Sequence, residues 1–216
     1  MLFVLTGDVQ IGKTRWLQAL THDLCAKGVL SCGVVAPGVW KPLAEGETER
    51  EKLGIDNLLL PQEKLIRFAR RNDLAQQEGV FNAASQSAQA GLKWEIDDAA
   101  IEEVNAHFAA LSKVADREGV GTVAARQGFS TPSTPFSSGG FLVVDELGRL
   151  ELLGDKGLTE AVALLDRGPT PLAEHALIVV RDWFADAACE RFSGSWPDIR
   201  RISPDDTARD EILSFF

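Results

Sequence analysis

The chain has 216 residues and a formal net charge of −10, with 45% hydrophobic and 25% charged residues. This length fits one α/β domain, and folding at this size buries roughly 70% of the chain's surface. The composition excludes a disordered chain, a collagen-like rod and a coiled coil. The acidic balance argues against a nucleic-acid polymer as partner, because such polymers attract basic surfaces. It does not exclude a local basic pocket for a small anion.

Cysteine usage and the absence of long apolar runs indicate the cellular compartment in which the protein is expected. Cys25, Cys32 and Cys189 are scattered and form no CxxC pair, which indicates free thiols. The first residues carry no basic segment of the kind that opens a signal peptide, and no run approaches the roughly 20 apolar residues of a membrane helix. We therefore expect a cytoplasmic protein that does not contact a membrane.

The first forty residues predict a strand, a loop, a helix and a second strand. Residues 2–5 form a short apolar run, which is typical of a buried strand. From Lys13 onward apolar residues recur at helical spacing, and Gly28 is placed to end that helix. A second strand is expected at residues 34–36. Together these elements predict a βαβ unit.

The middle of the chain, residues 39–96, has a weaker pattern. Its charged segment at residues 45–52 predicts a loop or a hairpin tip. Residues 61–71 are expected to form a short helix. Short strands are expected at residues 80–81 and 92–96.

A helix and a long loop are predicted next. Asp97 is a good N-cap, and Ile101, Val104 and Phe108 line one face of the helix that follows. Residues 119–140 are rich in Gly, Ser, Thr and Pro, which predicts a loop that buries little apolar surface. Its length indicates either a functional loop or a tolerated insertion.

The last third of the chain again alternates strands with helices. Residues 141–144 form a continuous apolar run, the pattern of a strand buried on both faces of a parallel sheet. A helix should include residues 158–165, and further strands are expected at residues 176–180 and 199–202. This alternation predicts an α/β fold with a mainly parallel sheet, and we expect residues 1–216 to form a single domain.

A final helix is predicted after residue 202. Ser203 is the expected N-cap and Pro204 the first helical residue. The expected apolar face contains Ala208, Ile212 and Phe215.

A glycine-rich motif follows the first strand and opens the first helix. It fits the P-loop pattern G-x-x-x-x-G-K-[ST]. In this loop, backbone N–H groups and the helix N-terminus face the phosphates of a nucleotide. Lys13 is expected to contact the β- and γ-phosphates and to assist catalysis, and Thr14 to bind Mg²⁺. The predicted phosphate-binding residues are Gly7, Asp8, Val9, Gln10, Ile11, Gly12, Lys13 and Thr14.

A pair of carboxylates follows the strand predicted at residues 141–144. A buried strand that delivers an acidic residue at its carboxyl end has the Walker B form, and this edge of a parallel sheet is where ligands bind. Asp145 is expected to bind Mg²⁺, and Glu146 to act as the general base that polarises the attacking water.

These motifs together resemble the small P-loop nucleoside-triphosphatase family first described from thermophiles. The resemblance rests on the loop at residues 7–14, on residues 33–39 and on the sequence DELGRLEL at residues 145–152, where Leu150 replaces the usual Met. It implies a RecA-like three-layer core with an antiparallel insertion at about residues 39–96. It also implies slow, Mg²⁺-dependent hydrolysis of ATP, GTP and other nucleoside triphosphates.

The chain departs from the family pattern at several positions. Gln10 replaces a glycine, Arg15 replaces a second Thr, and Asp8 adds a negative charge near the phosphates. Arg181 follows a predicted strand where a small polar residue is expected. It is either an arginine finger supplied within the chain or a charge on the rim of the site.

Two other functions fit the same motifs. A nucleotide or small-molecule kinase would use a hydroxyl acceptor in place of water, with the arginine pairs at 70–71 and 200–201 as candidates for a lid. A nucleotide-dependent switch would contact a protein partner through residues 119–140 and through Trp40, Trp94 or Trp183. A nucleoside triphosphate is the ligand in all three cases.

Overall fold

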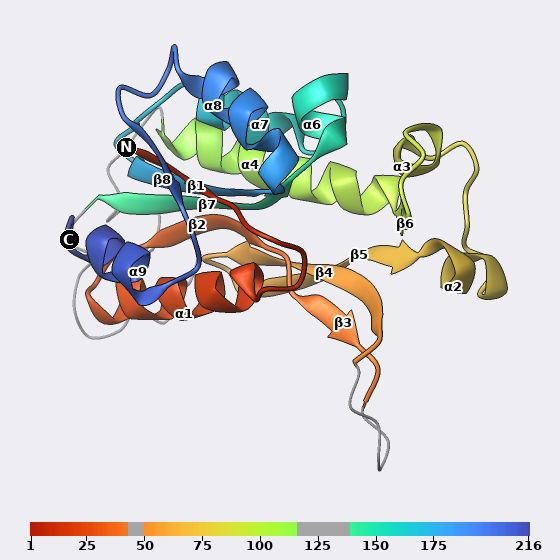
Figure 1. Cartoon of the computed structure of the whole chain (residues 1–216). Coiled ribbons are helices and arrows are strands. Elements are labelled where there is room, and N and C mark those ends of the chain that lie inside the picture. The colour runs from red at the N-terminus through yellow and green to blue at the C-terminus, as the bar shows by residue number, and fades with distance from the viewer. Residues whose placement is uncertain (43–49, 116–138) are drawn as a thin grey trace.

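A computed structural model describes residues 1–42, 50–115 and 139–216 of the chain. Its described residues form a nine-stranded sheet with helices on both faces (Figure 1). The prediction of a mixed α/β fold is therefore confirmed. Most of the loop predicted at residues 119–140, and most of the hairpin tip predicted at residues 45–52, lie outside the described residues.

The strands include every strand predicted in the first and last thirds of the chain. Their bounds are β1 (Leu2–Leu5), β2 (Ser31–Val35), β3 (Gly38–Trp40), β4 (Lys52–Leu60), β5 (Lys64–Arg71), β6 (Trp94–Ile96), β7 (Gly140–Leu147), β8 (Ala173–Val180) and β9 (Ile199–Ile202).

Outside the run of consecutive strands β2 to β5, one or two of the described helices separate successive strands, and a short 3₁₀ turn, η1 (Asp182–Phe184), follows β8. The helix bounds are α1 (Lys13–Ala26), α2 (Asn72–Gln77), α3 (Gln86–Gln89), α4 (Asp98–Ala115), α6 (Arg149–Gly154), α7 (Thr159–Asp166), α8 (Ala185–Phe192) and α9 (Asp206–Leu213).

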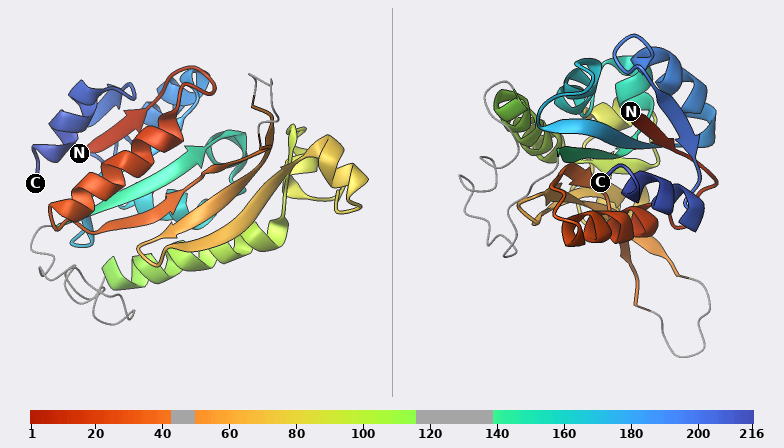
Figure 2. Two further views of the ribbon diagram at one scale, coloured as in Figure 1. Left: turned by 90° about the horizontal axis from the view of Figure 1, so that it is seen from below. Right: turned by 90° about the vertical axis from the view of Figure 1, so that its left-hand side faces the viewer.

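The sheet has a parallel part and an antiparallel part. Its strand order is β6-β5-β4-β2-β7-β8-β1-β9, with β3 paired to β4 (Figure 2). The strands β2, β7, β8, β1 and β9 are parallel, whereas β4 pairs antiparallel with β2, β3 and β5, and β5 with β6. The carboxyl ends of the parallel strands therefore meet at one edge, where ligands bind in such sheets.

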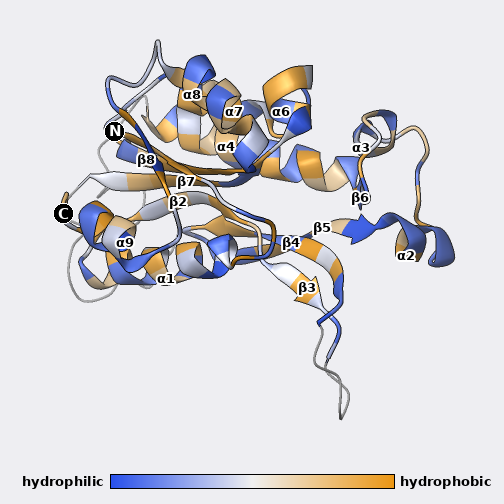
Figure 3. Cartoon of the chain, in the orientation of Figure 1, coloured by the Kyte–Doolittle hydropathy of each residue, from blue (hydrophilic) through white to orange (hydrophobic). Residues whose placement is uncertain are grey.

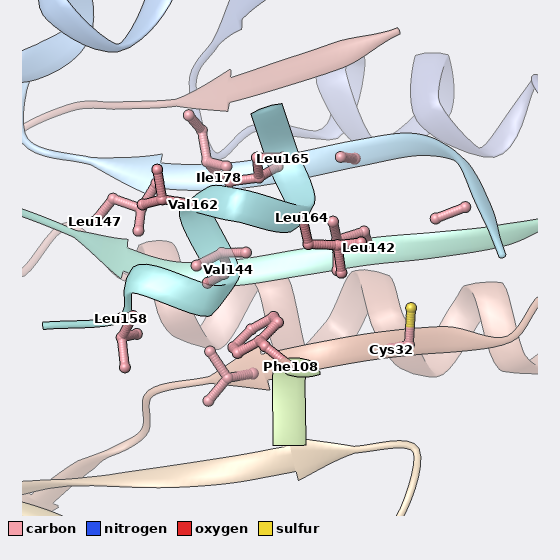
Figure 4. Close-up of a cluster of buried hydrophobic side chains, with 14 of the residues drawn as sticks. Cys32, Phe108, Leu142, Val144, Leu147, Leu158, Val162, Leu164, Leu165 and Ile178 are labelled. Atoms are coloured by element: carbon pink, nitrogen blue, oxygen red, sulfur yellow. The ribbon is translucent and has the colours of Figure 1, made fainter. Parts of the chain in front are cut away.

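The core lies in two layers because successive side chains of a strand point to opposite faces. Phe3 and Leu5 pack on the side of α1 and α9, whereas Leu2 and Val4 pack on the side of α4, α7 and α8. Apolar stretches run along the central strands in Figure 3. Figure 4 shows the second layer, where Phe108 of α4 lies among side chains of the sheet and α7.

The first βαβ unit forms as predicted, although β7 and β8 lie between its two strands in the sheet. Leu17, Leu20 and Leu24 of α1 are fully buried. Gly28 follows the end of α1 with a φ of 78°, the left-handed conformation expected for a glycine at this place. Asp97 is the N-cap of α4, since its side chain accepts a hydrogen bond from the backbone of Ala99 at 2.9 Å.

The helix predicted at residues 61–71 is wrong, because residues 64–71 form strand β5. Its partner is β4, and the two strands make a hairpin whose turn lies at residues 61–63. Ile66 and Ala69 are buried while Leu65 is 59% exposed. Pairing with β4 on one side and β6 on the other outweighs the local helical spacing, since a sheet satisfies the backbone with distant partners.

Two further predictions need correction. Residues 80–81 form no strand; they follow α2, and both backbone N–H groups donate to Ala75 O. The N-cap of the final helix is Asp205 and not Ser203, because the Asp205 carboxylate accepts from Ala208 N at 2.9 Å. Phe215 lies beyond this helix and is 42% exposed.

The thiols of Cys25, Cys32 and Cys189 are all free, as expected. None of the helices in the described ranges reaches the combination of length and hydrophobicity that crossing a membrane requires.

Candidate active site

The predicted phosphate loop connects β1 to α1 at the carboxyl edge of the sheet. Gly7 has a φ of 134° and Gly12 a φ of 98°, a region that side chains disfavour. A Cβ atom on Gly7 would lie 2.5 Å from Ile11 Cδ1, the end of an exposed side chain that can move, so the backbone conformation is the main reason for glycine there. Gln10 also lies in the left-handed region, with a φ of 65°. This explains why a glycine is the usual residue at that position of the family pattern.

The ammonium group of Lys13 binds the loop's own carbonyl groups. Lys13 Nζ donates to Gly7 O at 2.6 Å and to Asp8 O at 2.8 Å. On the outer side of the loop, Val9 is 60% exposed and Ile11 47% exposed. The Lys13 side chain therefore folds onto the loop whose bound phosphates it is expected to contact. Because this side chain is flexible, it can turn to reach a bound anion.

Asp145 lies near the end of β7 and is 3% exposed. Its carboxylate accepts hydrogen bonds from the Thr14 hydroxyl and from Ala36 N, the latter at 3.2 Å. Burial raises the pKa of this carboxyl to about 7, although both hydrogen bonds act in the opposite direction. The structure thus brings together the two side chains that the sequence assigns to Mg²⁺.

Glu146 follows Asp145 and faces a cationic partner. Arg181 Nε donates to Glu146 Oε1 at 2.8 Å, and about a third of each side chain is exposed. The Arg181 guanidinium also lies over the Trp183 ring, 5.5 Å from its centroid. Arg181, at the end of β8, is therefore part of the site and holds the carboxylate predicted to be the general base.

A cavity of about 370 Å³ opens beside these carboxylates. Its walls come from β4, β5 and β6 of the antiparallel part and from the segments that follow β7 and β8. Its polar lining residues are Thr14, Lys52, Asn57, Lys93, Asp145, Glu146, Arg149, Glu151 and Arg181.

Lys52 and Asn57 of β4 line the cavity beside the carboxylates, and the sequence pattern predicted neither of them. Lys52 Nζ lies over the rings of Trp40 and Trp94, at 5.9 and 5.5 Å from their centroids. Burial lowers the pKa of Lys52, and the nearby charges of Glu146 and Asp145 oppose that change. No spacing signal points to either residue, because hairpin pairing alone brings β4 to the site.

The arginine pairs considered for a kinase lid lie elsewhere. They do not line the cavity, and each of these arginines is bound to a carboxylate of the surface. The pairs are Arg70 with Glu78, Arg71 with Glu51 and Asp73, Arg200 with Glu211, and Arg201 with Asp186. Of the three tryptophans considered for partner contacts, Trp183 is 64% exposed.

The oxygen donors at the loop suit a magnesium ion. Among the described residues there is no cluster of three His, Cys, Asp or Glu side chains that would bind a metal alone. Mg²⁺ is usually held by one or two carboxylates together with substrate phosphates and waters. The adjacent Thr14 hydroxyl and Asp145 carboxylate match that incomplete donor set.

No family model and no curated protein sequence matches the chain. Its structure is similar to the solution structure of a human cancer-related nucleoside triphosphatase, with a TM-score of 0.54. The two share 16% sequence identity, over 99% of this chain and 93% of that chain. The chain therefore has a fold that a nucleoside triphosphatase also has.

Proposed function

We propose that this chain hydrolyses nucleoside triphosphates, ATP and GTP among them, to the diphosphate and phosphate in the presence of Mg²⁺. The observation that carries the proposal is the meeting of three parts at one sheet edge: the phosphate loop, the Thr14–Asp145 pair and Glu146 held by Arg181. The fold similarity to a human nucleoside triphosphatase supports it. The strand order also suits a RecA-like core, since β8 lies between β1 and the strand that carries Asp145.

Binding relies on contacts to the phosphates. Backbone N–H groups of the loop and the N-terminus of α1 favour an anion. Lys13 exchanges the carbonyl groups of Gly7 and Asp8 for phosphate oxygens. Since these groups contact no base, we propose that several nucleoside triphosphates are accepted. A net charge of −10 does not oppose this, because the attraction is local.

The residues at the γ-phosphate then perform the chemistry. Arg181 holds Oε1 of Glu146 and leaves its second oxygen to accept a proton from the attacking water. Thr14 and Asp145 would hold Mg²⁺, which neutralises charge on the phosphates when bound. Lys13 stabilises the negative charge that develops on the transferred group.

The direct test measures phosphate release from ATP, GTP, CTP and UTP, each with Mg²⁺ and with EDTA. We expect release from several of them with Mg²⁺, without any added acceptor, and loss of release in EDTA. No release from any triphosphate by folded protein would contradict the proposal. Release that begins only when a protein partner is added would favour the switch.

A further inference from the structure

The cavity beside Glu146 adjoins the phosphate loop at one residue and extends away from it. Of the eight loop residues only Thr14 lines it, together with Asp145, Glu146 and Arg181. Thr14 and Asp145 mark the metal end of the loop, where the γ-phosphate of a P-loop nucleotide lies. A molecule in the cavity would therefore lie on the side of the general base, beyond the group that is transferred.

The walls of this cavity suit an organic molecule with an apolar part. Ile55, Phe68, Ile96, Ile101 and Leu158 line it from the sheet and from the segments that cover it. A volume of about 370 Å³ is in the range of pockets that hold small organic ligands. A site that admits only the attacking water would not require so many apolar lining residues.

Asn57 provides an independent indication of a ligand. Its side chain lines the cavity and is 1% exposed, yet neither Oδ1 nor Nδ2 has a hydrogen-bond partner among the described residues. A buried amide without partners costs about 1–3 kcal/mol of stability, so such a group in a folded protein calls for an explanation, and a bound ligand is one. A carboxamide offers an acceptor beside a donor, which is complementary to the edge of a nucleobase.

The charges that line the cavity nearly balance, so they do not call for an anionic ligand. Four cationic side chains line it against three carboxylates, and a bound triphosphate would add negative charge. The arginine pairs that a phosphorylated acceptor would use are bound to surface carboxylates. The seven charged lining residues are Lys52, Lys93, Arg149, Arg181, Asp145, Glu146 and Glu151.

We propose that this cavity binds a nucleoside and that the chain transfers the γ-phosphoryl group of its bound triphosphate to a hydroxyl group of that nucleoside. The proposal rests on the proposed nucleotide site.

The hydroxyl oxygen attacks the γ-phosphorus, and the bond from that phosphorus to the β–γ bridging oxygen breaks. The hydroxyl proton passes to the Glu146 carboxylate. The products are a nucleoside monophosphate and a nucleoside diphosphate, and water replaces the hydroxyl group when the cavity holds no nucleoside.

The test follows the label of [γ-³²P]ATP in the presence of Mg²⁺ and adenosine, guanosine or uridine at millimolar concentration. We expect label in a nucleoside monophosphate with at least one of the three. Asn57→Leu should lower that transfer tenfold or more, whereas ATP affinity and phosphate release without nucleoside stay within about twofold. Asn82→Leu replaces an exposed asparagine outside the cavity and should leave all three quantities unchanged.

Each result has one meaning. Label in no nucleoside monophosphate, with phosphate release intact, overturns the acceptor site and leaves the hydrolase standing. Weaker ATP binding by folded Asn57→Leu also overturns it, because the cavity would then hold the base of the triphosphate itself. Failure of the wild type to bind any triphosphate removes both proposals. Ile101→Phe narrows the same cavity from α4 and should also lower transfer, so the outcome does not depend on one variant.

Discussion

The parallel and antiparallel parts of the sheet contribute to the site in different ways. The parallel strands β1 and β7 end in a contiguous loop and an adjacent pair of carboxylates, whose spacing is visible in the sequence. The antiparallel strand β4 contributes Lys52 and Asn57 as single side chains, placed by pairing with β2 and β5. The predicted phosphate-binding residues are therefore contiguous in the chain, whereas the adjoining cavity depends on how the hairpin pairs and on the segments that cover it.

The largest effect is expected at Glu146. Glu146→Gln keeps a group that can accept from Arg181 but cannot take a proton from water, so turnover should fall about 10²–10⁴-fold. ATP affinity, measured by calorimetry, should stay near that of the wild type. Glu78→Gln is a matched control, because Glu78 is also paired with an arginine but does not line the cavity. Equal losses of affinity and turnover by folded Glu146→Gln would remove Glu146 from the role of base.

Asp145 should make the metal-free protein sensitive to pH. Burial raises the pKa of its carboxyl to about 7, whereas in the unfolded chain it titrates near its ordinary value of 3.8. Between these values the folded protein holds a proton that the unfolded chain has released, so the free energy of unfolding falls as pH rises. For this group the fall amounts to at most roughly 4 kcal/mol.

Urea unfolding in EDTA at pH 5 and pH 8 measures this effect. Asp145→Asn should be more stable than the wild type at pH 8, with a smaller change between the two pH values. Mg²⁺ should stabilise the wild type more at pH 8 than at pH 5, since it binds the carboxylate form. Parallel pH profiles of the two proteins would contradict the raised pKa.

Lys13 should affect binding of the triphosphate. Lys13→Ala removes charge-assisted hydrogen bonds worth about 1.5–3 kcal/mol, so ATP affinity should fall roughly 10- to 100-fold. Lys27→Ala removes a lysine from beyond the other end of α1 and should leave affinity unchanged. Unchanged ATP affinity of folded Lys13→Ala would refute the phosphate-loop assignment.

In the antiparallel part, substitution of Asn57 should stabilise the protein. Asn57→Leu replaces a buried amide that has no partner among the described residues, so the free energy of unfolding should rise by about 1 kcal/mol. Asn105→Leu is the opposite case, because the Asn105 amide donates to Gly157 O at 2.9 Å and accepts from Glu160 N at 3.1 Å. Loss of these two hydrogen bonds should lower the free energy of unfolding. Urea unfolding of both variants decides whether the Asn57 amide is unsatisfied.

The smallest effect is expected at Gln10. Gln10→Gly removes the backbone strain of a residue with a side chain at a φ of 65°, but glycine also raises the conformational entropy of the unfolded chain. The two effects oppose each other, so the free energy of unfolding should change by about 1 kcal/mol or less. ATP affinity should be kept, since the backbone N–H groups remain in place. A large loss of affinity in a calorimetric titration would show that the glutamine side chain itself contacts the nucleotide.

Much of the fold was predictable where burial and local pattern agree. The apolar runs at β1, β7 and β8 are strands buried on both faces, and the spacing of Leu17, Leu20 and Leu24 faces one side of α1. Residues 64–71 show the opposite case, because their spacing fits a helix while their partners on β4 and β6 make them a strand. At the final helix both Ser203 and Asp205 are residues that can serve as N-cap, and the structure shows that Asp205 does, because its carboxylate accepts from Ala208 N.

The sequence by itself determined the glycine-containing loop at residues 7–14, the carboxylate pair and the apolar strand segments that precede them, because these are patterns of residues adjacent in the chain. Tertiary structure alone decided the pairing of Glu146 with Arg181, 35 residues away, and the position of Asn57 in the cavity wall. Contacts of this kind depend on strand register and on the folding of distant segments onto one edge. The residue pattern of one strand does not show which distant strand it pairs with.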